Sequence, residues 1–395
     1  MPAQNKNGTL AVYLGIVQFF FATTWTLYVI YLPRLAAQAG VGAQWVPWIL
    51  VADQVIFAVT DVATGFWIDR LRRGLARFGG WILGFTVLSG VAFLALPYSA
   101  GNAPVLLVAI LVWSVTSSAL RSPPWALLAQ HAAAPSVPLL STLVLTGSAV
   151  AAALSPYLGI ALKGVDPRLP FAVSTLTLLA TVAGLVYAER RVSTGSPSTR
   201  NLSEIKKEQN AGSILLFFVA LLLMAAGFQV HFALNSAPRY LAFAAPERLP
   251  YLMPVFWIGF NIVMFPASGL VKRLGPLQTL AGAAALGAAA ILGSVLARDL
   301  QALAFAQFIA GGFWGAASVA MYTAAIGFGR TGREGRMLGT LFAVLALAAF
   351  VRIAAYASDL VVLPQLKALL PWIPEAAWLA SAVLFFLAVR ASRRG

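Results

Sequence analysis

Two carboxylates and one guanidinium lie in stretches of the sequence that are otherwise apolar. Asp53 and Asp61 are eight residues apart in a run of Val, Ile, Ala, Phe, Thr and Gly, and Arg121 interrupts a later run. On an α-helix this spacing brings the two acids to within about 80° of each other. A charge at membrane depth costs at least about 2.5–3.5 kcal/mol, so such groups usually face a cavity or a partner. We therefore predict a solute or proton pathway here.

Asp61 and Arg121 should lie at the same depth. If residues 45–69 and 104–130 are helices that cross in the same direction, each of the two side chains lies about 6 Å beyond the midpoint. They can therefore pair, and this pair is either a solute contact or a structural tie between helices. Asp53 lies about 12 Å further out without an evident partner, which makes it the better candidate proton carrier. The alternative for Asp53 is a carboxyl group hydrogen-bonded within the helix bundle.

The composition is typical of a helical membrane protein. Of the 395 residues 60% are hydrophobic and 10% are charged, and the mean hydropathy is +0.85. The net charge of +15 comes from short basic clusters between apolar runs, a pattern of cytoplasmic loops that argues against nucleic-acid binding. There is no Cys, and the acids are too scattered for a metal site. We expect a monomeric, multi-pass protein of the bacterial inner or plasma membrane, embedded in the lipid bilayer and without a cofactor.

Apolar runs of about 20 residues predict an all-α membrane protein with twelve transmembrane helices. The expected spans are residues 9–33, 45–69, 79–98, 104–130, 137–162, 169–188, 213–237, 250–271, 277–297, 301–327, 337–358 and 370–389. Most of the 27 Lys and Arg residues fall on one side of these spans, which predicts that both termini are cytoplasmic.

The chain divides into two halves that echo each other. The polar segment 189–212 separates a predicted six-helix bundle at 1–188 from a second one at 213–395. YLPRLA at 31–36 is similar to SAPRYL at 236–241, and TGFWIDRL at 64–71 is weakly similar to SGLVKRLG at 268–275. Both echoes are about 205 residues apart, as expected for two pseudo-symmetric six-helix bundles.

A short motif follows the second expected span. Gly65, Asp69, Arg70, Arg72 and Arg73 resemble the G-x-x-x-D-R-x-x-R signature of the major facilitator superfamily, and the arrangement of two times six helices fits that family along the whole chain. The resemblance implies a transporter in which this signature holds helix ends together on the cytoplasmic side. It also implies that the signature takes part in the switch between inward-open and outward-open states.

A finer resemblance concerns the glycoside–pentoside–hexuronide cation symporters, the melibiose permease branch. AVTDVATGFWIDR at 58–70 looks like the second helix of that branch, and LRSPPWALLA at 120–129, with Pro123 and Trp125, looks like its fourth helix. Phe57 stands where the branch has its first acid, and Arg121 stands at the acid of the fourth helix. A guanidinium repels sodium, so we expect that the sodium site of the branch is lost and that protons are the coupling ion.

Polar residues in the second half are the other binding candidates. Gln229, His231 and Asn235 lie at roughly helical spacing in the outer part of the seventh expected span, and Arg352 is the charge within the eleventh. The family resemblance implies that helices one, four, seven and ten line a central cavity, which adds the rings of Tyr28 and Trp125 as solute contacts. Packing roles stay open for the rings and for His231.

These observations predict a secondary active transporter rather than an enzyme. The sequence has no nucleotide-binding loop and no Ser/His/Asp set, so the energy must come from a gradient. We expect proton-coupled symport of a small polar solute, a sugar or an organic anion, by alternating access. The alternatives are a lipid or lysolipid translocator on the same fold and a membrane scaffold or sensor that does not transport.

Overall fold

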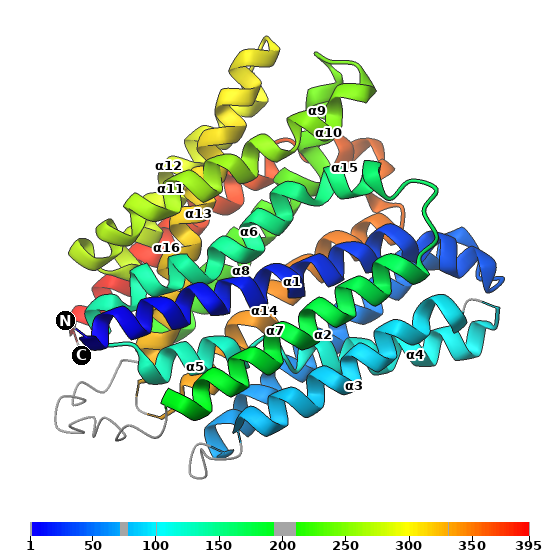
Figure 1. Ribbon diagram of the computed structural model, residues 1–395. Coiled ribbons are helices and arrows are strands. Elements are labelled where there is room, and N and C mark those ends of the chain that lie inside the picture. Colours follow the sequence, from blue (N-terminus) through cyan, green and yellow to red (C-terminus); the bar gives the residue numbers. More distant parts are fainter. Residues whose placement is uncertain (1, 72–77, 100, 193–210, 331, 395) are drawn as a thin grey trace.

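The computed structural model of the protein describes residues 2–71, 78–99, 101–192, 211–330 and 332–394, which are almost entirely helical (Figure 1). The α-helices of this part are α1 (Pro2–Gln38), α2 (Val46–Leu71), α3 (Phe78–Ser99), α4 (Ala103–Ser118), α5 (Pro123–His131), α6 (Val137–Ala161), α7 (Arg168–Val192), α8 (Ala211–Gln229), α9 (Ser236–Leu241), α10 (Leu249–Leu252), α11 (Pro254–Leu274), α12 (Pro276–Leu296), α13 (Leu300–Gly329), α14 (Glu334–Ala357), α15 (Pro364–Leu369) and α16 (Ile373–Arg394).

The predicted set of membrane spans is confirmed. Within the described residues, eleven helical segments are long and apolar enough to cross a membrane, and the sixth expected span is the shorter apolar part of α7, Arg168–Gly184. Helices suit this role because they satisfy their own backbone hydrogen bonds where no water is present. The protein is therefore an integral, multi-pass membrane protein.

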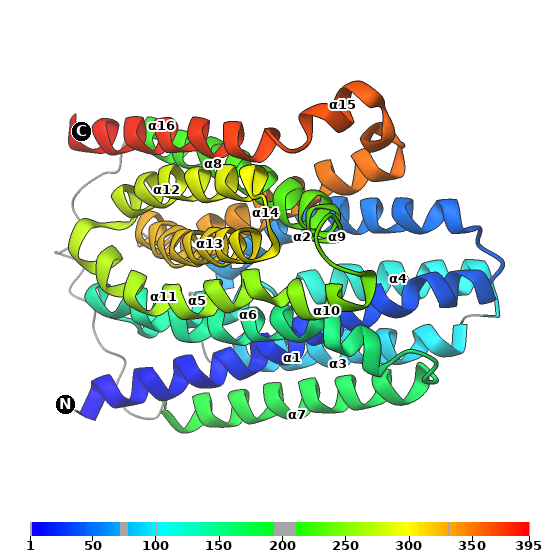
Figure 2. The same cartoon turned by 90° about the horizontal axis from the view of Figure 1, so that it is seen from above.

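The helices form two groups that converge at the end carrying both termini. In the first group α1 packs against α6 and α7, and α3 packs against α4 and α7. In the second group α8 and α12 pack against α16, and α11 and α12 pack against α13. Figure 1 shows the groups spreading apart away from the termini, and Figure 2 shows α7 and α16 at opposite edges of the molecule. The predicted boundary at 189–212 stays a prediction, because 193–210 lies outside the described residues.

Two seams join the groups. Helix α2 packs along α14, and α6 packs along α11. We call these the α2–α14 seam and the α6–α11 seam. Each seam brings together helices that are far apart in the sequence, so residues from both groups meet there.

The fourth expected span is not one continuous helix. The residues 104–130 were expected as a single element, but α4 ends at Ser118 and α5 begins at Pro123, with a turn between them. Pro123 and Pro124 explain the break, because proline lacks the N–H group of the helical ladder and clashes with the preceding turn. Arg121 therefore lies on an irregular segment. Such backbone is tolerated at membrane depth where protein buries it or a cavity adjoins it.

The seventh expected span also changes its helical form. A π-helix, Val230–Asn235, connects α8 to α9, so the candidates on this segment do not follow the spacing of an ordinary α-helix. The segment is tied to the loop before α16, because Asn235 Nδ2 donates to the Leu370 carbonyl oxygen at 2.7 Å. In the first group Arg34 Nη1 donates to the Val165 carbonyl oxygen at 2.8 Å. The two acceptor residues are about 205 positions apart, as in the internal repeat, but the donors do not correspond, because the repeat aligns Arg34 with Arg239.

Candidate functional site

The predicted ion pair between Asp61 and Arg121 is present. Arg121 Nη1 lies 2.9 Å from Asp61 Oδ2, and the Ser118 hydroxyl group donates to Asp61 Oδ1 at 3.1 Å. The Asp61 side chain is fully buried, whereas that of Arg121 keeps 20% of its surface exposed. The guanidinium carbon lies 5.0 Å from the centroid of the Phe342 ring on α14, within the range of a cation–π contact. The ion pair of the first group is thus covered by a side chain of the second.

An aromatic stack crosses between the groups nearby. The rings of Trp125 on α5 and Tyr322 on α13 are stacked with centroids 3.8 Å apart and an angle of 14° between their planes. Both rings are buried. In this conformation the Trp125 ring is covered by Tyr322 and is not open to a solute. The stack and the ion pair instead form one layer of contacts between the groups.

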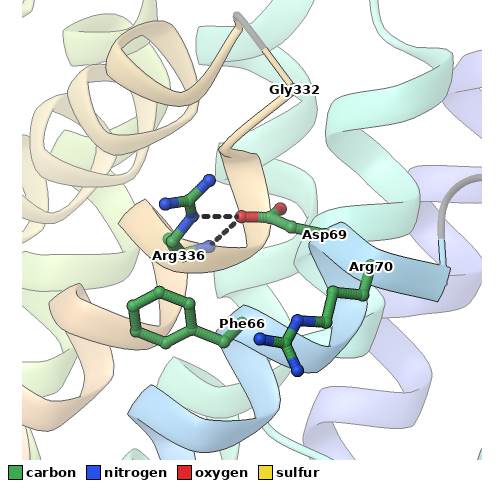
Figure 3. Close-up of a pocket in the computed structure, with 5 residues that line it drawn as sticks. All are labelled: Phe66, Asp69, Arg70, Gly332 and Arg336. Carbon is green, nitrogen blue, oxygen red and sulfur yellow. Dashed lines mark hydrogen bonds and ion pairs between the residues drawn. The ribbon is translucent and has the colours of Figure 1, made fainter.

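The signature motif holds the start of α14. Asp69 Oδ1 accepts a hydrogen bond from the Gly335 N–H group at 2.8 Å, and Oδ2 accepts from the backbone N–H and Nε of Arg336, each at 3.1 Å (Figure 3). The carboxylate therefore meets both the free N–H groups of a helix start and its positive dipole end. Asp69 and Arg336 line a pocket of about 480 Å³, and Arg70 lines it as well. Arg72 and Arg73 lie outside the described residues.

The glycine of the signature allows this close approach. A Cβ atom at Gly65 would collide with the carbonyl oxygen of Gly335 and would crowd the Cα atom of Gly339. The α2–α14 seam is therefore a contact of backbone on backbone at this level. Any side chain at position 65 would have to push α2 and α14 apart.

Asp53 has partners that the sequence did not reveal. Its carboxylate accepts hydrogen bonds from the hydroxyl groups of Tyr28, at 2.8 Å, and Ser114, at 2.5 Å. Asp53 is 1% exposed, and the Trp113 ring packs against Tyr28 with centroids 4.5 Å apart. All four residues belong to the first group. The expectation that Asp53 lacks a partner is therefore wrong, because two hydroxyl groups satisfy it within α1, α2 and α4.

The candidates on the seventh span fall into different places. His231 is buried, with Nε2 3.1 Å from Gln307 Oε1 on α13, and Gln307 Nε2 donates to the Ser236 hydroxyl oxygen at 3.1 Å. His231 and Asn235 line a pocket of about 460 Å³ within the second group. Gln229 is half-buried and does not line that pocket.

Arg352 is the second cation within the spans and has a different environment. Its side chain is half-buried, and its Nε atom is buried without a hydrogen-bond partner. Within the described part of the chain it forms no hydrogen bond or ion pair. An unpaired guanidinium at membrane depth is costly, so it marks a place where a ligand can supply the opposite charge. Arg121, by contrast, is already neutralised by Asp61.

The comparisons with known proteins agree on the fold. The structure is similar to a bacterial homologue of the iron transporter ferroportin in the outward-facing state, with a TM-score of 0.74 and 13% identity over 96% of this chain and 99% of that one. It is similar to the human organic anion transporter MFSD10 (TETRAN), with a TM-score of 0.68 and 16% identity over 98% of this chain and 99% of that one. It is also similar to the transporter FucP in the outward conformation, with a TM-score of 0.70 and 14% identity over 97% of this chain and 98% of that one.

The sequence comparison places the chain in one family. A search of the curated proteins finds no match by sequence. Residues 14–351, however, match the family model described as Major Facilitator Superfamily. This match covers most of the chain and includes both seams, the ion pair and the signature motif. With the similar transporter structures, it shows that the protein is a transporter rather than an enzyme and that the chain belongs to the Major Facilitator Superfamily.

Proposed function

We propose that the protein is a secondary active transporter that moves a small organic anion across the membrane by alternating access. The observation that carries this proposal is the unpaired guanidinium of Arg352. Asp61 pairs with Arg121, so it is not available to Arg352. The positive charge of Arg352 therefore has no acidic partner within the described spans. A carboxylate or phosphate group on the solute would pair with the Arg352 guanidinium and offset the cost of keeping this half-buried charge in the membrane.

The contacts between the groups form the gate in this proposal. The Asp69 contact with α14, the stack of Trp125 on Tyr322, and the cover of Phe342 over Arg121 all join the groups toward the end that carries the termini. Alternating access requires these contacts to separate when the groups rock about the solute. If the termini are cytoplasmic, as the distribution of basic residues predicts, the structure is outward-facing.

Asp61 is the coupling residue that we favour. Protonation of its carboxylate would remove the charge that holds Arg121, and Phe342 lies directly over that guanidinium. A proton on Asp61 would therefore loosen a contact between the groups and free Arg121 for the solute. Asp53 is bonded only to residues of the first group, so its protonation would change the gate less directly. Asp53 stays the second candidate for the proton site.

A sugar is the second candidate solute, because the chain is similar in fold to FucP, the E. coli fucose:proton symporter. The rings predicted to stack on a sugar are occupied here, since Tyr28 donates to Asp53 and Trp125 stacks on Tyr322. The finer resemblance to the glycoside–pentoside–hexuronide branch remains a proposal that rests on the residues around Asp61 and Trp125. No specific observation favours a lipid translocator or a scaffold.

Uptake into proteoliposomes tests the proposed solute class. Glucuronate and glucose are suitable probes because they share a ring and differ in the carboxylate. We expect uptake of glucuronate, with kcat/KM reduced roughly ten- to a hundredfold in Arg352→Gln and largely kept in Arg352→Lys, because a hydrogen bond to a charged group contributes about 1.5–3 kcal/mol. Arg298→Gln, at an exposed loop, is the matched control. The proposal would be contradicted if glucose and glucuronate were taken up equally well and Arg352→Gln left both rates unchanged.

A further inference from the structure

A pocket of about 460 Å³ lies within the second group. Two of the elements that line it, α9 and α15, lie at the end of the bundle away from the termini (Figure 1). The π-helix Val230–Asn235, α9, the end of α12, α13, the end of α14 and α15 supply its walls. Its volume is in the range of small-molecule sites. None of the gate residues lines it, and neither does Arg352. The pocket is therefore distinct from the contacts that join the two groups.

Two polar residues that line the pocket, His231 and Gln307, are held in a fixed arrangement. The side chains of His231 and Gln307 are paired there at 3.1 Å, and both residues are almost fully buried. Gln307 is held on its other side by the Ser236 hydroxyl group, which in turn donates to the His231 carbonyl oxygen at 2.9 Å. This closed ring of bonds fixes the positions of polar atoms among the lining residues of the pocket. π-Helical segments are frequent at functional sites, which is consistent with a binding role here.

The charge that lines the pocket is positive. Arg239 and Lys367 are among the lining residues, and no Asp or Glu of the described chain is. The Arg239 guanidinium donates to the carbonyl oxygens of Ser294 and Ala297 at the end of α12, so its charge complements the negative dipole end of that helix. Lys367 is exposed, and its side chain forms no hydrogen bond or ion pair with the described residues. Its ammonium group is the cation available to a ligand.

The segment that carries Lys367 is fixed over the pocket. Asn235 Nδ2 donates to the Leu370 carbonyl oxygen at 2.7 Å, and Leu370 lies three residues after Lys367. Around it, Leu363, Leu369 and Trp372 expose about half of their side-chain surface. Exposed apolar residues beside a lysine are typical of a membrane interface. An anion could therefore reach this pocket either from solution or as the headgroup of a lipid.

We propose that this pocket binds an anionic oxygen group, a carboxylate or a phosphate, with Lys367 as the charge partner. The bonded His231–Gln307 pair forms the polar part of the pocket lining beside that ligand. The site does not depend on transport, because it is argued from the pocket alone. It would operate even if Arg352 did not contact the transported solute.

Titration of the purified full chain in neutral detergent tests whether the pocket binds an anion from solution. Calorimetric titration with glucuronate, and with glucose as the neutral match, is carried out in the Arg352→Gln background so that the proposed transport site does not contribute. We expect glucuronate affinity to fall about tenfold in Lys367→Gln and to be kept in Lys367→Arg. Lys163→Gln is the matched control, because Lys163 is exposed in the corresponding loop of the first group. It should leave affinity unchanged.

Nanodiscs test the lipid source. Native mass spectrometry compares the lipid retained by the chain from phosphatidylglycerol and from phosphatidylcholine discs, again with the Lys367 and Lys163 variants. Selective retention of phosphatidylglycerol that is lost in Lys367→Gln would support the site with a lipid headgroup as its ligand. If neither glucuronate affinity nor phosphatidylglycerol retention responds to Lys367→Gln, the proposal is overturned. That result would leave the effect of Arg352→Gln on uptake, and hence the transport proposal, unaffected.

Discussion

Asp61 Oδ2 lies 2.9 Å from Arg121 Nη1, and this bond joins a continuous helix to the turn at which another helix is broken. Phe342 covers the guanidinium from the other group. A single residue pair thus links a buried acid, a helix break and a contact between the two halves. Changes at this pair should affect both stability and gating.

Loss of Arg121 should be more harmful than loss of both partners. Arg121→Gln leaves the buried Asp61 carboxylate without its cation, which we expect to lower the free energy of unfolding by about 3 kcal/mol. Asp61→Asn combined with Arg121→Gln should cost clearly less, because no charge is stranded. Thermal unfolding of the purified variants, treated as a double-mutant cycle, measures the difference. Additive effects of the two single changes would show that the pair contributes no coupling.

The two acids should differ in their effect on proton coupling. We expect Asp61→Asn to abolish the stimulation of uptake by an inward proton gradient, because the titrating carboxyl group at the gate is removed. Asp53→Asn should keep that stimulation and lower mainly stability, since Tyr28 and Ser114 bond to it within one group. Initial uptake rates in proteoliposomes with and without the gradient distinguish the two. Proton dependence that survives Asp61→Asn and disappears in Asp53→Asn would reverse the assignment.

Removal of Arg352 should stabilise the protein while impairing transport. The guanidinium has no partner in the described part of the chain, so Arg352→Met replaces a half-buried, unpaired charge with an apolar side chain. Replacements of buried charges by apolar residues are often stabilising, and we expect an increase of about 1 kcal/mol in the free energy of unfolding. Thermal unfolding and glucuronate uptake of the same preparation check both effects. A less stable Arg352→Met variant would indicate a structural role instead.

A methyl group at position 65 should open the α2–α14 seam. Because a Cβ atom there collides with the Gly335 carbonyl oxygen, Gly65→Ala should shift the population toward states in which the terminal end is open. The chain has no Cys, so spin labels at Gly80→Cys and Leu274→Cys report on the distance between the groups at that end. Gly84→Ala is the control, because its Cβ atom would meet no neighbour within 4 Å. An unchanged distance distribution in Gly65→Ala would contradict the prediction.

Asp69 should set the balance between closed and open states. Asp69→Ala removes all three hydrogen bonds to Gly335 and Arg336, and Asp69→Asn keeps an acceptor oxygen while it removes the charge. A loss of about 1–2 kcal/mol would reduce the ratio of closed to open states roughly five- to thirtyfold. We expect Asp69→Asn to lie between Asp69→Ala and the unchanged chain in the same spin-label measurement. Identical distributions for all three would exclude a gating role for this carboxylate.

The sequence was sufficient for the spans and for the ion pair because both depend on regular geometry. Apolar length predicts a span, and equal depth on two helices predicted that Asp61 and Arg121 could meet. The break before Pro123 could also have been foreseen, since two consecutive prolines end a helical pattern. The partners of Asp53 could not, because Ser and Tyr are common in apolar runs and nothing in the sequence singles out Ser114.

Contacts across the seams were also beyond the sequence. Phe342 and Tyr322 belong to ordinary apolar stretches, and their pairing with Arg121 and Trp125 joins residues some 200 positions apart. The π-helix was hidden for a similar reason. The contacts that Gln307 on α13 makes with His231 and Ser236 join this segment to a helix about 70 positions away.

Among the residues that the structure describes, the Asp69 contact has no counterpart on the α6–α11 seam. The internal repeat places Arg273 on α11 where α2 has Asp69, and a guanidinium cannot accept bonds from the N–H groups of a helix start. Helix α6 packs against α11 in the α6–α11 seam and carries no charged residue. Its Thr142 hydroxyl group donates one hydrogen bond of 3.4 Å to the Met264 carbonyl oxygen on α11. The two groups are thus joined by several hydrogen bonds along the α2–α14 seam and mainly by packing along the α6–α11 seam. We therefore expect the two sides of the terminal end to separate asymmetrically.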